Sequence, residues 1–526
     1  MNKYRFRMVI PAYPAFNVYS NIARMTTCLG PVYVATNVHK MSNWDAEVID
    51  ENNFSLHAPK DEFDQPDHGR MQRQRPADVV GFYGGLTSTV PRLYEVAGFY
   101  KSRGVITVAG GQHFSGDNIL DALSHGIDYV VIGEGELVIK ELLAAIMGQG
   151  EIDQVKGLAY FKNGKLFFTG EREKLADFDQ LPLPDFSLVR YARIKIYPVE
   201  RIRGCGMDCE FCTVKGQPRP ARPERLLAQI SILVETRDAR HFFIVDDLFG
   251  QYRDETIRFC YILKDYQKRI GKKLDFTAQI RLDKAKDPEL LSAMYQAGIN
   301  KVCIGYESPI AEELKAMNKH IQPEDMLALT KIFHDFGFLV HGMFIFGYPL
   351  DEGTHFTMTA KERVERYLTF IRKAKLDTVQ VLLPVPLPGT LMTERLKRQK
   401  RIYDIRYIGW EFYDGNFPIF EPDAPLTAEE MQASQKQIMT SFYQFKYFLK
   451  IGLDILMLPA VIIFFHDIQR GWINWYRYWR NDLLRVLGWG IVKEWNLNFK
   501  KNRFVEKLQI AKGHIRQDGY PFASHP

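Results

Sequence analysis

The sequence predicts an α/β protein with a doubly wound, Rossmann-like N-terminal domain, a partial (β/α)6 barrel and a mainly helical C-terminal region. In residues 1–150, short apolar runs alternate with helical patterns, which indicates βαβ units around a parallel sheet. A second series of strand-like and helical runs in residues 193–400 indicates an open relative of the eight-stranded barrel. Residues 401–526 carry mainly helical patterns, and residues 151–192 connect the two strand-rich parts.

The composition is that of an ordinary globular protein. The chain has 526 residues, enough for two or three domains, with 46% hydrophobic and 25% charged residues. The net charge of +6 is small for this length and argues against a nucleic-acid partner. The six cysteines are too scattered for a disulfide framework, and we see no signal-peptide pattern and no long uncharged apolar run. We therefore expect a cytoplasmic protein without a membrane-spanning helix.

The N-terminal domain is expected to contain five parallel strands. They are Phe6–Ile10, Glu47–Ile49, Val79–Tyr83, Val105–Ala109 and Tyr129–Ile132. Helical patterns such as Pro91–Lys101 and Asn118–Ser124 lie between them. Sheets of this kind bind ligands beyond the carboxyl ends of their strands.

Glycine and small polar residues gather at those carboxyl ends. They are Gly84 and Thr87 after the third strand, Gly110 and Gly111 after the fourth, and Gly133 and Glu134 after the fifth. Glycines at such positions let the backbone approach a flat or bulky ligand closely. We interpret the neighbouring His113 as a solvated loop residue.

The connector, residues 151–192, begins with a predicted hairpin. Asn163 and Gly164 supply the turn between two short apolar runs. A proline-rich stretch, residues 181–186, then indicates extended backbone, because proline disfavours helix at the residue before it. We place a domain boundary here.

The predicted barrel has six strands. They are Ile194–Ile202, His241–Asp246, Phe276–Ile280, Lys301–Gly305, Gly342–Phe346 and Thr378–Leu383. Several candidate binding residues lie at their carboxyl ends, where barrels of this type carry out chemistry: Asp246, Asp247, Gln279, Arg281, Glu307 and Gly347. Carboxylates and amides can hold ammonium or hydroxyl groups there, and arginine can hold a carboxylate by two parallel hydrogen bonds. The alternative for each is a structural salt bridge or strand-end cap.

Three cysteines follow the first barrel strand at a tight spacing. Cys205, Cys209 and Cys212 form the pattern Cys-x-x-x-Cys-x-Phe-Cys, with Phe211 before the last cysteine. Thiolates are soft ligands that suit iron–sulfur clusters or zinc. Such sites usually take four ligands, so three in one loop leave one metal position open for chemistry. A zinc site with a fourth ligand elsewhere is the competing interpretation.

This segment resembles the cluster loop of the radical S-adenosylmethionine (radical SAM) family. The resemblance implies a 4Fe-4S cluster on Cys205, Cys209 and Cys212, with S-adenosylmethionine (SAM) chelating the fourth iron. It also implies reductive cleavage of SAM to a 5′-deoxyadenosyl radical. Under this resemblance the polar strand-end residues contact SAM or the substrate.

The N-terminal loops resemble the cobalamin-binding domain that precedes many radical SAM cores. Cobalamin is therefore the cofactor expected at the Gly84, Gly110 and Gly133 loops. One feature departs from some cobalamin proteins: the Asp-x-His-x-x-Gly motif, whose histidine ligates cobalt, is absent.

The resemblance leaves three functions open. The first is methylation of an unactivated carbon by a cobalamin-dependent radical enzyme. The second is cyclisation, rearrangement or oxidation of a large apolar substrate with the same cofactors. The third is a cobalamin or metal sensor without catalysis, to which the polar residues at the barrel mouth would be of no use. A reducing partner such as flavodoxin or ferredoxin is expected for either enzyme.

The C-terminal region contains a helix start and an aromatic stripe. Thr427 and Glu430 form a capping-box pattern that predicts a helix to about Tyr447, and residues 453–465 suggest a short buried helix. Trp472, Trp475, Tyr476 and Trp479 fall on one helical face. This face either packs against the barrel or lies in a membrane interface. In the second case, residues 466–503 would make peripheral contact with the inner face of the membrane, and a lipid-like or polycyclic substrate would become attractive.

Overall fold

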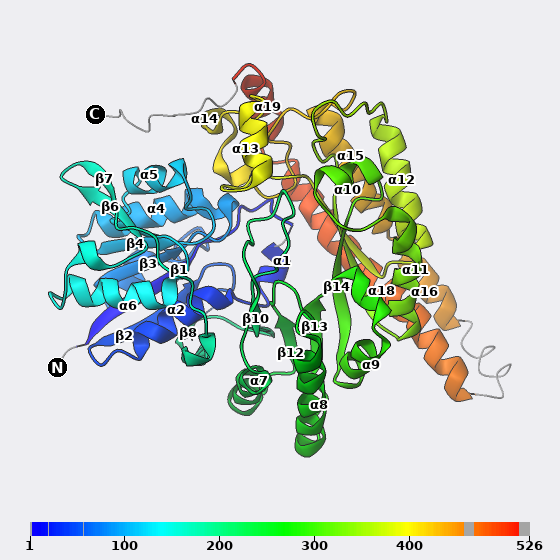
Figure 1. Cartoon of the computed structure of the whole chain (residues 1–526), viewed down its shortest axis with the longest axis horizontal. Helices are drawn as coiled ribbons and strands as arrows, with labels where there is room; N and C mark the ends of the chain where they lie inside the picture. The colour runs from blue at the N-terminus through cyan, green and yellow to red at the C-terminus, as the bar shows by residue number, and fades with distance from the viewer. Residues whose placement is uncertain (1–2, 19, 56, 457–467, 515–526) are drawn as a thin grey trace.

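The computed structural model describes residues 3–18, 20–55, 57–456 and 468–514, without side chains for 454–456 and 468–480. Figure 1 shows an N-terminal sheet with its helices beside a second, barrel-like sheet, and C-terminal helices that run along the second sheet and over the junction. The predicted fold class is confirmed: parallel sheets form both strand-rich parts, and the C-terminal region is helical.

The first sheet has eight strands in the order β7-β6-β5-β4-β3-β1-β2-β8. The strands are β1 (Tyr4–Ile10), β2 (Trp44–Asp50), β3 (Val79–Tyr83), β4 (Ile106–Gly110), β5 (Tyr129–Val131), β6 (Leu158–Lys162), β7 (Lys165–Phe168) and β8 (Val189–Arg190). Strands β1 to β5 and β8 are parallel, whereas β6 and β7 form an antiparallel hairpin on the β5 edge. The hairpin and β8, both within the expected connector, thus extend the N-terminal sheet.

Helices cover both faces of this sheet. They are α1 (Ser20–Ala23), α2 (Leu29–His39), α3 (His68–Gln74), α4 (Val90–Lys101), α5 (Asp117–Ser124) and α6 (Gly135–Ile146). Phe6 and Met8 belong to the apolar cluster that includes α2 and α6, whereas Val9 belongs to the cluster on the α4 and α5 side. Successive strand residues point to opposite faces, so β1 must be apolar on both.

The second sheet has six parallel strands in the order β16-β15-β14-β13-β12-β9. The strands of this part are β9 (Ile196–Val199), β10 (Ile202–Arg203), β11 (Arg219–Pro220), β12 (His241–Ile244), β13 (Asp275–Gln279), β14 (Ile299–Glu307), β15 (Leu339–Ile345) and β16 (Thr378–Leu382). Its helices are α7 (Pro223–Arg237), α8 (Arg253–Ile270), α9 (Pro288–Gln296), α10 (Ala311–Ala316), α11 (Pro323–Asp335), α12 (Ala360–Lys373) and α13 (Leu391–Arg398).

The first barrel strand is shorter than the sequence predicts. The run 194–202 splits into β9 and β10, and β10 pairs antiparallel with β11 instead of joining the sheet. The backbone N–H groups of Arg201 and Ile202 donate to the Asp246 carboxylate, at 2.6 and 3.0 Å. This side-chain acceptor satisfies the backbone where the strand ladder stops.

The C-terminal region joins both sheets. Its helices are α14 (Ile405–Ile408), α15 (Ala428–Phe442), α16 (Lys446–Leu456), α18 (Ile468–Phe499) and α19 (Phe504–Ala511), with a short 3-10 turn, η6 (Trp410–Phe412). Trp410 Nε1 donates to Asp121 of α5 at 3.2 Å, and Phe412 stacks on Phe16 with 5.1 Å between ring centroids. The segment around η6 therefore packs on the N-terminal domain.

The predicted helix start at Thr427 is present, but the helix ends earlier than expected. Thr427 and Glu430 make the reciprocal bonds of a capping box. Helix α15 stops at Phe442 because Tyr443 turns inward, where its hydroxyl accepts from Val379 N–H and donates to Val379 carbonyl, at 2.9 and 2.8 Å. The bonds between Tyr443 and the backbone of β16 thus determine where α15 ends.

Two expectations fall largely outside the described residues. The predicted buried helix over 453–465 overlaps the undescribed segment 457–467, and the aromatic stripe of Trp472, Trp475, Tyr476 and Trp479 has no described side chains. The backbone of the stripe belongs to α18. Among the helices that the structure describes, none combines the length and apolar character needed to cross a bilayer.

Candidate functional site

The three cysteines lie in one loop between β10 and β11. These strands close the base of the loop, with Arg203 opposite Arg219. Gly204 begins the loop with φ +90°, and a side chain there would come within 2.8 Å of the Gln217 carbonyl oxygen, so only glycine fits. The cysteines are free and partly exposed: Cys205, Cys209 and Cys212.

Asp246 and Asp247 brace the segment that leads into this loop. Asp246 is buried and accepts from the backbone of Arg201 and Ile202, and Asp247 Oδ2 accepts from Gly204 N–H at 2.7 Å. Burial raises the pKa of Asp246 to about 7 and raises that of Asp247 as well. The bonds that both side chains make are those of strand-end caps, the alternative that the sequence left open.

Glu210, between the second and third cysteines, fastens the loop to the far side of the barrel. Its carboxylate accepts two hydrogen bonds from Arg395 of α13, each 2.7 Å long, and a third of 2.7 Å from the Tyr348 hydroxyl. Its backbone N–H donates to the Met317 carbonyl, and its carbonyl accepts from Met392 N–H. The loop is thus held by residues that follow three different barrel strands.

Glu307 occupies a strained position at the end of β14. Its φ is +60°, unusual for a residue with a side chain, and the strand register shifts between Gly305 and Glu307. A Cβ on Gly305 would lie 2.4 Å from Glu307 Oε1, so the carboxylate folds back over a glycine. Lys319 Nζ pairs with Glu307 at 2.7 Å. Burial opposes the charge on Lys319, but the pairing with Glu307 prevails and the net pKa shift is upward.

Arg281 contacts the cysteine loop directly. Its Nη1 lies 2.8 Å from the Met207 sulfur atom, two residues after the first cysteine, while Nε donates to Asp283 at 3.0 Å. Gln279 ends β13 with its side chain exposed. Phe211 meets Tyr348 edge to face, with 6.1 Å between centroids, and Gly347 immediately precedes this tyrosine. The structure therefore brings Arg281, Phe211 and Gly347 to the loop.

The predicted glycine loops of the first sheet contact one another. A Cβ on Gly111, whose φ is +131°, would lie 2.5 Å from the backbone of Gly84, and one on Gly84 would lie 2.3 Å from Phe114. Gly84 N–H also donates to the Gly110 carbonyl at 2.7 Å. Close packing between these loops is therefore one reason for glycine at these positions.

His113 is not the solvated loop residue that the sequence suggested. Its side chain is 1% exposed and meets the rings of Phe114 and Trp410 edge to face. Its Nδ1 lies 3.3 Å from the hydroxyl of buried Thr87. The C-terminal region covers it, which the local sequence could not reveal.

A cleft of about 220 Å³ opens at the carboxyl ends of β1, β2 and β3. The residues that line it include Tyr13, Thr27, Cys28, Asp50 and Tyr83. Burial raises the pKa of Asp50 to about 6 and raises those of Tyr13, Cys28 and Tyr83. The cleft thus combines polar groups whose charged forms are disfavoured by burial with apolar walls, and it lies at the edge where sheets of this topology bind ligands.

Two arginines join this sheet to the cysteine loop. Arg203 pairs with Glu136 of α6 at 2.7 Å and with Glu200 at 2.6 Å. Arg219 pairs with Glu134 at 2.5 Å. The carboxylate of Glu134, predicted from the sequence to contact the cofactor, is therefore bound by an arginine from the barrel. Burial raises the pKa of Glu200, while the three carboxylates around Arg203 outweigh its own burial and raise the pKa of the guanidinium.

The residues present fit the cofactors that these motifs imply. Three thiols with no fourth cysteine in the loop are the donor set for a cluster with one open iron. Burial raises the pKa of Cys209 and Cys212, so a bound cation is needed to stabilise their thiolates. Among the described residues, no group of three or more aspartate, glutamate, histidine or cysteine side chains is arranged to hold a metal ion in the absence of the cluster. In the first sheet, a Cβ on Gly133 would meet no atom within 4 Å, which leaves open space for a ligand beside the loop.

Comparison with known families decides the identity of these parts. A model of the radical SAM superfamily matches residues 199–361, and a model of the B12 binding domain matches residues 32–143. The chain is a radical SAM protein with a B12-binding domain. It is therefore a radical SAM enzyme, and a 4Fe-4S cluster, SAM and cobalamin are its cofactors.

Individual relatives of this radical SAM enzyme include methyltransferases. It is 27% identical over 427 residues to an uncharacterized methyltransferase of Pyrococcus horikoshii, covering 79% of this chain and 87% of the relative. It is 27% identical over 246 residues to the hopanoid C-2 methylase of Rhodopseudomonas palustris, covering 46% of this chain and 45% of that protein. The solved structure of the cobalamin-dependent SAM radical enzyme OxsB, with aqua-cobalamin and SAM bound, shares the fold, with a TM-score of 0.63 at 14% identity over 98% of this chain and 82% of that one.

Sequence reasoning missed several residues that organise the site. They are Arg203, Glu210, Arg219, Lys319, Tyr348 and Arg395. Glu210 could have been noticed, because it lies inside the cysteine motif. Arg395 gave no local signal, since it is an ordinary basic residue near the end of a helix.

Proposed function

We propose that this enzyme transfers a methyl group to an unactivated carbon of a small-molecule substrate. The observation that carries the proposal is the joining of two sites: Arg203 and Arg219 tie the three-cysteine loop at the barrel mouth to the ligand-binding edge of a B12-type sheet. When bound, the cluster and SAM supply a carbon-centred radical, and cobalamin supplies a carrier for the methyl group.

We assign a role to each part of the chain in this reaction. Cys205, Cys209 and Cys212 would hold the cluster, with Phe211 packed beside them. Glu307 with its partner Lys319, together with Arg281 and Gln279, would orient SAM or the substrate, because they offer both signs of charge beside the loop. The loops at Gly84, Thr87, Gly110, Gly111, Gly133 and Glu134 would contact cobalamin.

Other residues would keep the site fixed and dry. Asp246 and Asp247 hold the backbone before Cys205, and Glu210 fastens the same loop through Arg395. The residues of η6 would cover the edge of the first sheet at which cobalamin would bind, because Trp410 packs on buried His113. Such rigid support protects a reactive radical from solvent and side reactions.

The test uses anaerobically reconstituted enzyme with SAM and a strong reductant, with and without hydroxocobalamin. 5′-Deoxyadenosine and S-adenosylhomocysteine are measured together. We expect both products, the second only with cobalamin. Formation of 5′-deoxyadenosine alone in the presence of cobalamin would instead favour cyclisation, rearrangement or oxidation, and the product mass would identify which. Bound zinc without iron, and neither product, would favour a cobalamin or metal sensor. A flavodoxin or ferredoxin would serve as the physiological reductant.

We further propose that helices α16 and α18 touch a membrane surface at the cytoplasmic face. In α16, Phe448, Leu449 and Leu453 are 56%, 60% and 63% exposed, and Leu487 of α18 is 58% exposed. Lys446 and Lys493 lie on the same two helices, so apolar side chains and cations occur together, as in helices that lie in a membrane interface. This location would suit a lipid-like or polycyclic substrate.

Vesicle flotation tests this contact. We expect the full chain to float with vesicles of mixed phosphatidylcholine and phosphatidylglycerol, and the double variant Phe448→Asp, Leu449→Asp to stay in solution. Leu166→Asp is the matched control, because this leucine is equally apolar and 49% exposed but lies on the β6–β7 hairpin. Equal flotation of all three proteins would contradict membrane contact through α16.

A further inference from the structure

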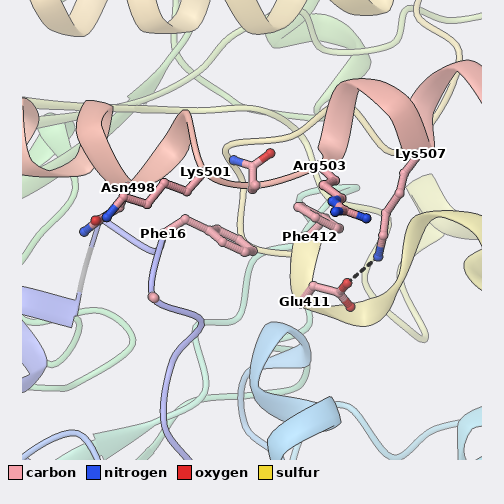
Figure 2. A pocket seen from close by; sticks show the side chains of 9 residues that line it. Phe16, Glu411, Phe412, Asn498, Lys501, Arg503 and Lys507 are labelled. Carbon is pink, nitrogen blue, oxygen red and sulfur yellow. Dashed lines mark hydrogen bonds and ion pairs between the residues drawn. The ribbon is translucent and has the colours of Figure 1, made fainter. Parts of the chain in front are cut away.

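A second pocket lies where the C-terminal helices meet the loop after β1. Its volume is about 390 Å³, within the range of small-molecule sites. Figure 2 shows the residues that line it: Ala15, Phe16, Glu411, Phe412, Asn498, Lys501, Asn502, Arg503 and Lys507. None of them belongs to the cysteine loop or to the glycine loops of the first sheet.

The floor of this pocket is aromatic. Phe16 and Phe412 stack nearly parallel, with 8° between their rings. Phe412 is 3% exposed, and its edge also packs on Phe417 and Phe504, so the stacked pair is fixed from behind. A rigid apolar floor of this kind favours a ligand with a hydrocarbon or ring portion.

The rim of the pocket is cationic. Lys507 is neutralised by Glu411, at 2.6 Å. Within the described part of the chain, Lys501 and Arg503 form an ion pair with no carboxylate, and Figure 2 shows them on the Phe16 and Phe412 sides of the pocket. Asn498 adds a neutral side-chain amide to the lining, whereas the Asn502 side chain is engaged by the backbone of Phe499 and Phe504. Two cations without a carboxylate partner in the described chain, together with the Asn498 amide, are complementary to an anionic group.

The pocket adjoins the cobalamin-type cleft through one short stretch of backbone. Ile10, Pro11 and Tyr13 line the cleft, and Ala15 and Phe16, directly after them, line the pocket. A ligand in the pocket therefore lies beside the segment that shapes the cofactor edge. That position suits part of a substrate better than an unrelated effector.

We propose that this pocket binds the anionic end of an amphipathic substrate, a phosphate or carboxylate carried on an apolar body. The cations Lys501 and Arg503 hold the anion, and the Phe16–Phe412 pair holds the first apolar atoms. The proposal rests on the proposed function, because it names the class of molecule that would be methylated.

Binding to the cofactor-loaded enzyme tests this site independently of turnover. Decyl phosphate, decanoate, decyl glucoside and inorganic phosphate are each titrated by calorimetry, below the concentrations at which the chains form micelles. We expect the two anionic chains to bind at least about tenfold more tightly than either neutral decyl glucoside or inorganic phosphate, a difference of about 1.4 kcal/mol.

Variants locate the binding. The double change Lys501→Gln, Arg503→Gln should weaken the binding of decyl phosphate by at least about tenfold, because it removes both cations that would form charge-assisted hydrogen bonds with the anion. Lys500→Gln is the matched control, because it removes one positive charge from a residue next to Lys501 that does not line the pocket. The affinity of this variant for decyl phosphate should stay within about twofold of the wild type. Both lining cations are exposed, so the variants should fold.

Each contrary result overturns the proposal. If all variants bind decyl phosphate with the affinity of the wild type, the anion binds elsewhere. If decyl glucoside binds as tightly as decyl phosphate, the negative charge of the ligand contributes nothing to binding. Inorganic phosphate binding as tightly as decyl phosphate would make this a free-phosphate site. None of these results depends on SAM cleavage, so failure here would leave the proposed reaction standing, and absence of SAM cleavage would not affect the binding measurement.

Discussion

Arg395 and Glu210 form a bidentate ion pair that joins helix α13 to the loop carrying the three cysteines. The two hydrogen bonds are each 2.7 Å long, and the residues are 185 positions apart in the chain. The side chains are only 10% and 13% exposed. Arg395 also donates to the carbonyls of Pro349 and Leu350, so one guanidinium connects the cysteine loop with the segment that follows β15.

Replacing Glu210 by glutamine should destabilise the folded enzyme by about 3 kcal/mol, because it leaves a largely buried guanidinium without its counter-charge. The measurement is urea unfolding of the anaerobic protein, together with iron content after reconstitution, which should also fall. Glu394→Gln is the control on the same helix: the side chain is 52% exposed and, within the described residues, forms an ion pair only with Lys397, so its loss should change stability by less than about 0.5 kcal/mol. Equal stability of Glu210→Gln and the wild type would show that the clamp is dispensable.

Asp246 should make stability fall as pH rises toward 7. Burial raises the pKa of this carboxyl from 3.8 to about 7 in the folded state, so between these values the folded protein binds one more proton than the unfolded chain. The stabilising contribution is complete below pH 3.8, declines through this window and is absent above about pH 7. In Asp246→Asn the group cannot ionise, while one amide oxygen can still accept from Arg201 and Ile202.

Unfolding free energies at pH 5.5 and pH 8 test this. Other buried carboxyls, such as Asp50 and Asp414, contribute in the same direction, so the difference between wild type and variant is the informative quantity. We expect Asp246→Asn to gain stability relative to wild type as pH rises. A difference that stays constant with pH would contradict the buried, proton-binding state of Asp246.

Cys209→Ala should abolish formation of 5′-deoxyadenosine and leave cobalamin binding intact. Removing one thiolate leaves two protein ligands for the cluster, while the glycine loops of the first sheet lie in a different part of the chain. Product formation and the visible spectrum of bound cobalamin are measured on the same sample. Cys260→Ala, a buried cysteine in α8 outside the loop, should retain SAM cleavage. Unchanged cleavage by Cys209→Ala would refute the cluster assignment.

Arg203→Gln should loosen the contact between the two sheets. Glu136 and Glu200 would lose their shared cation, and a destabilisation of about 3 kcal/mol is expected for a largely buried charge left unpaired. Hydrogen exchange at residues 133–136 and 202–204 should accelerate, whereas exchange in the centre of β3 should not. Arg193→Gln is the control for charge, because this exposed residue near the junction forms no ion pair within the described part of the chain. Unaltered exchange at both segments would show that Arg203 does not couple the sheets.

Local patterns were sufficient to predict most of the strands. Apart from Arg7, Phe6–Ile10 and Val79–Tyr83 are apolar on both faces, as is typical of buried parallel strands, and the structure places β1 and β3 there. The capping box at Thr427 likewise determined where α15 begins, because the bonds that form it lie within four residues. Where an element ends was less predictable: β9 and α15 stop because Asp246 and Tyr443 make bonds to distant backbone.

The sequence by itself determined the chemistry of this protein, because the three thiols lie within eight consecutive residues and their spacing alone brings them together. Only the tertiary structure decided what supports them. Arg395 and Glu210, or Arg203 and Glu136, meet across long chain separations, and nothing in their local sequence distinguishes them from surface charges. The tertiary structure also decided the burial of His113 and the raised pKa of Asp246, because the solvation of a side chain depends on segments that pack over it from elsewhere in the chain.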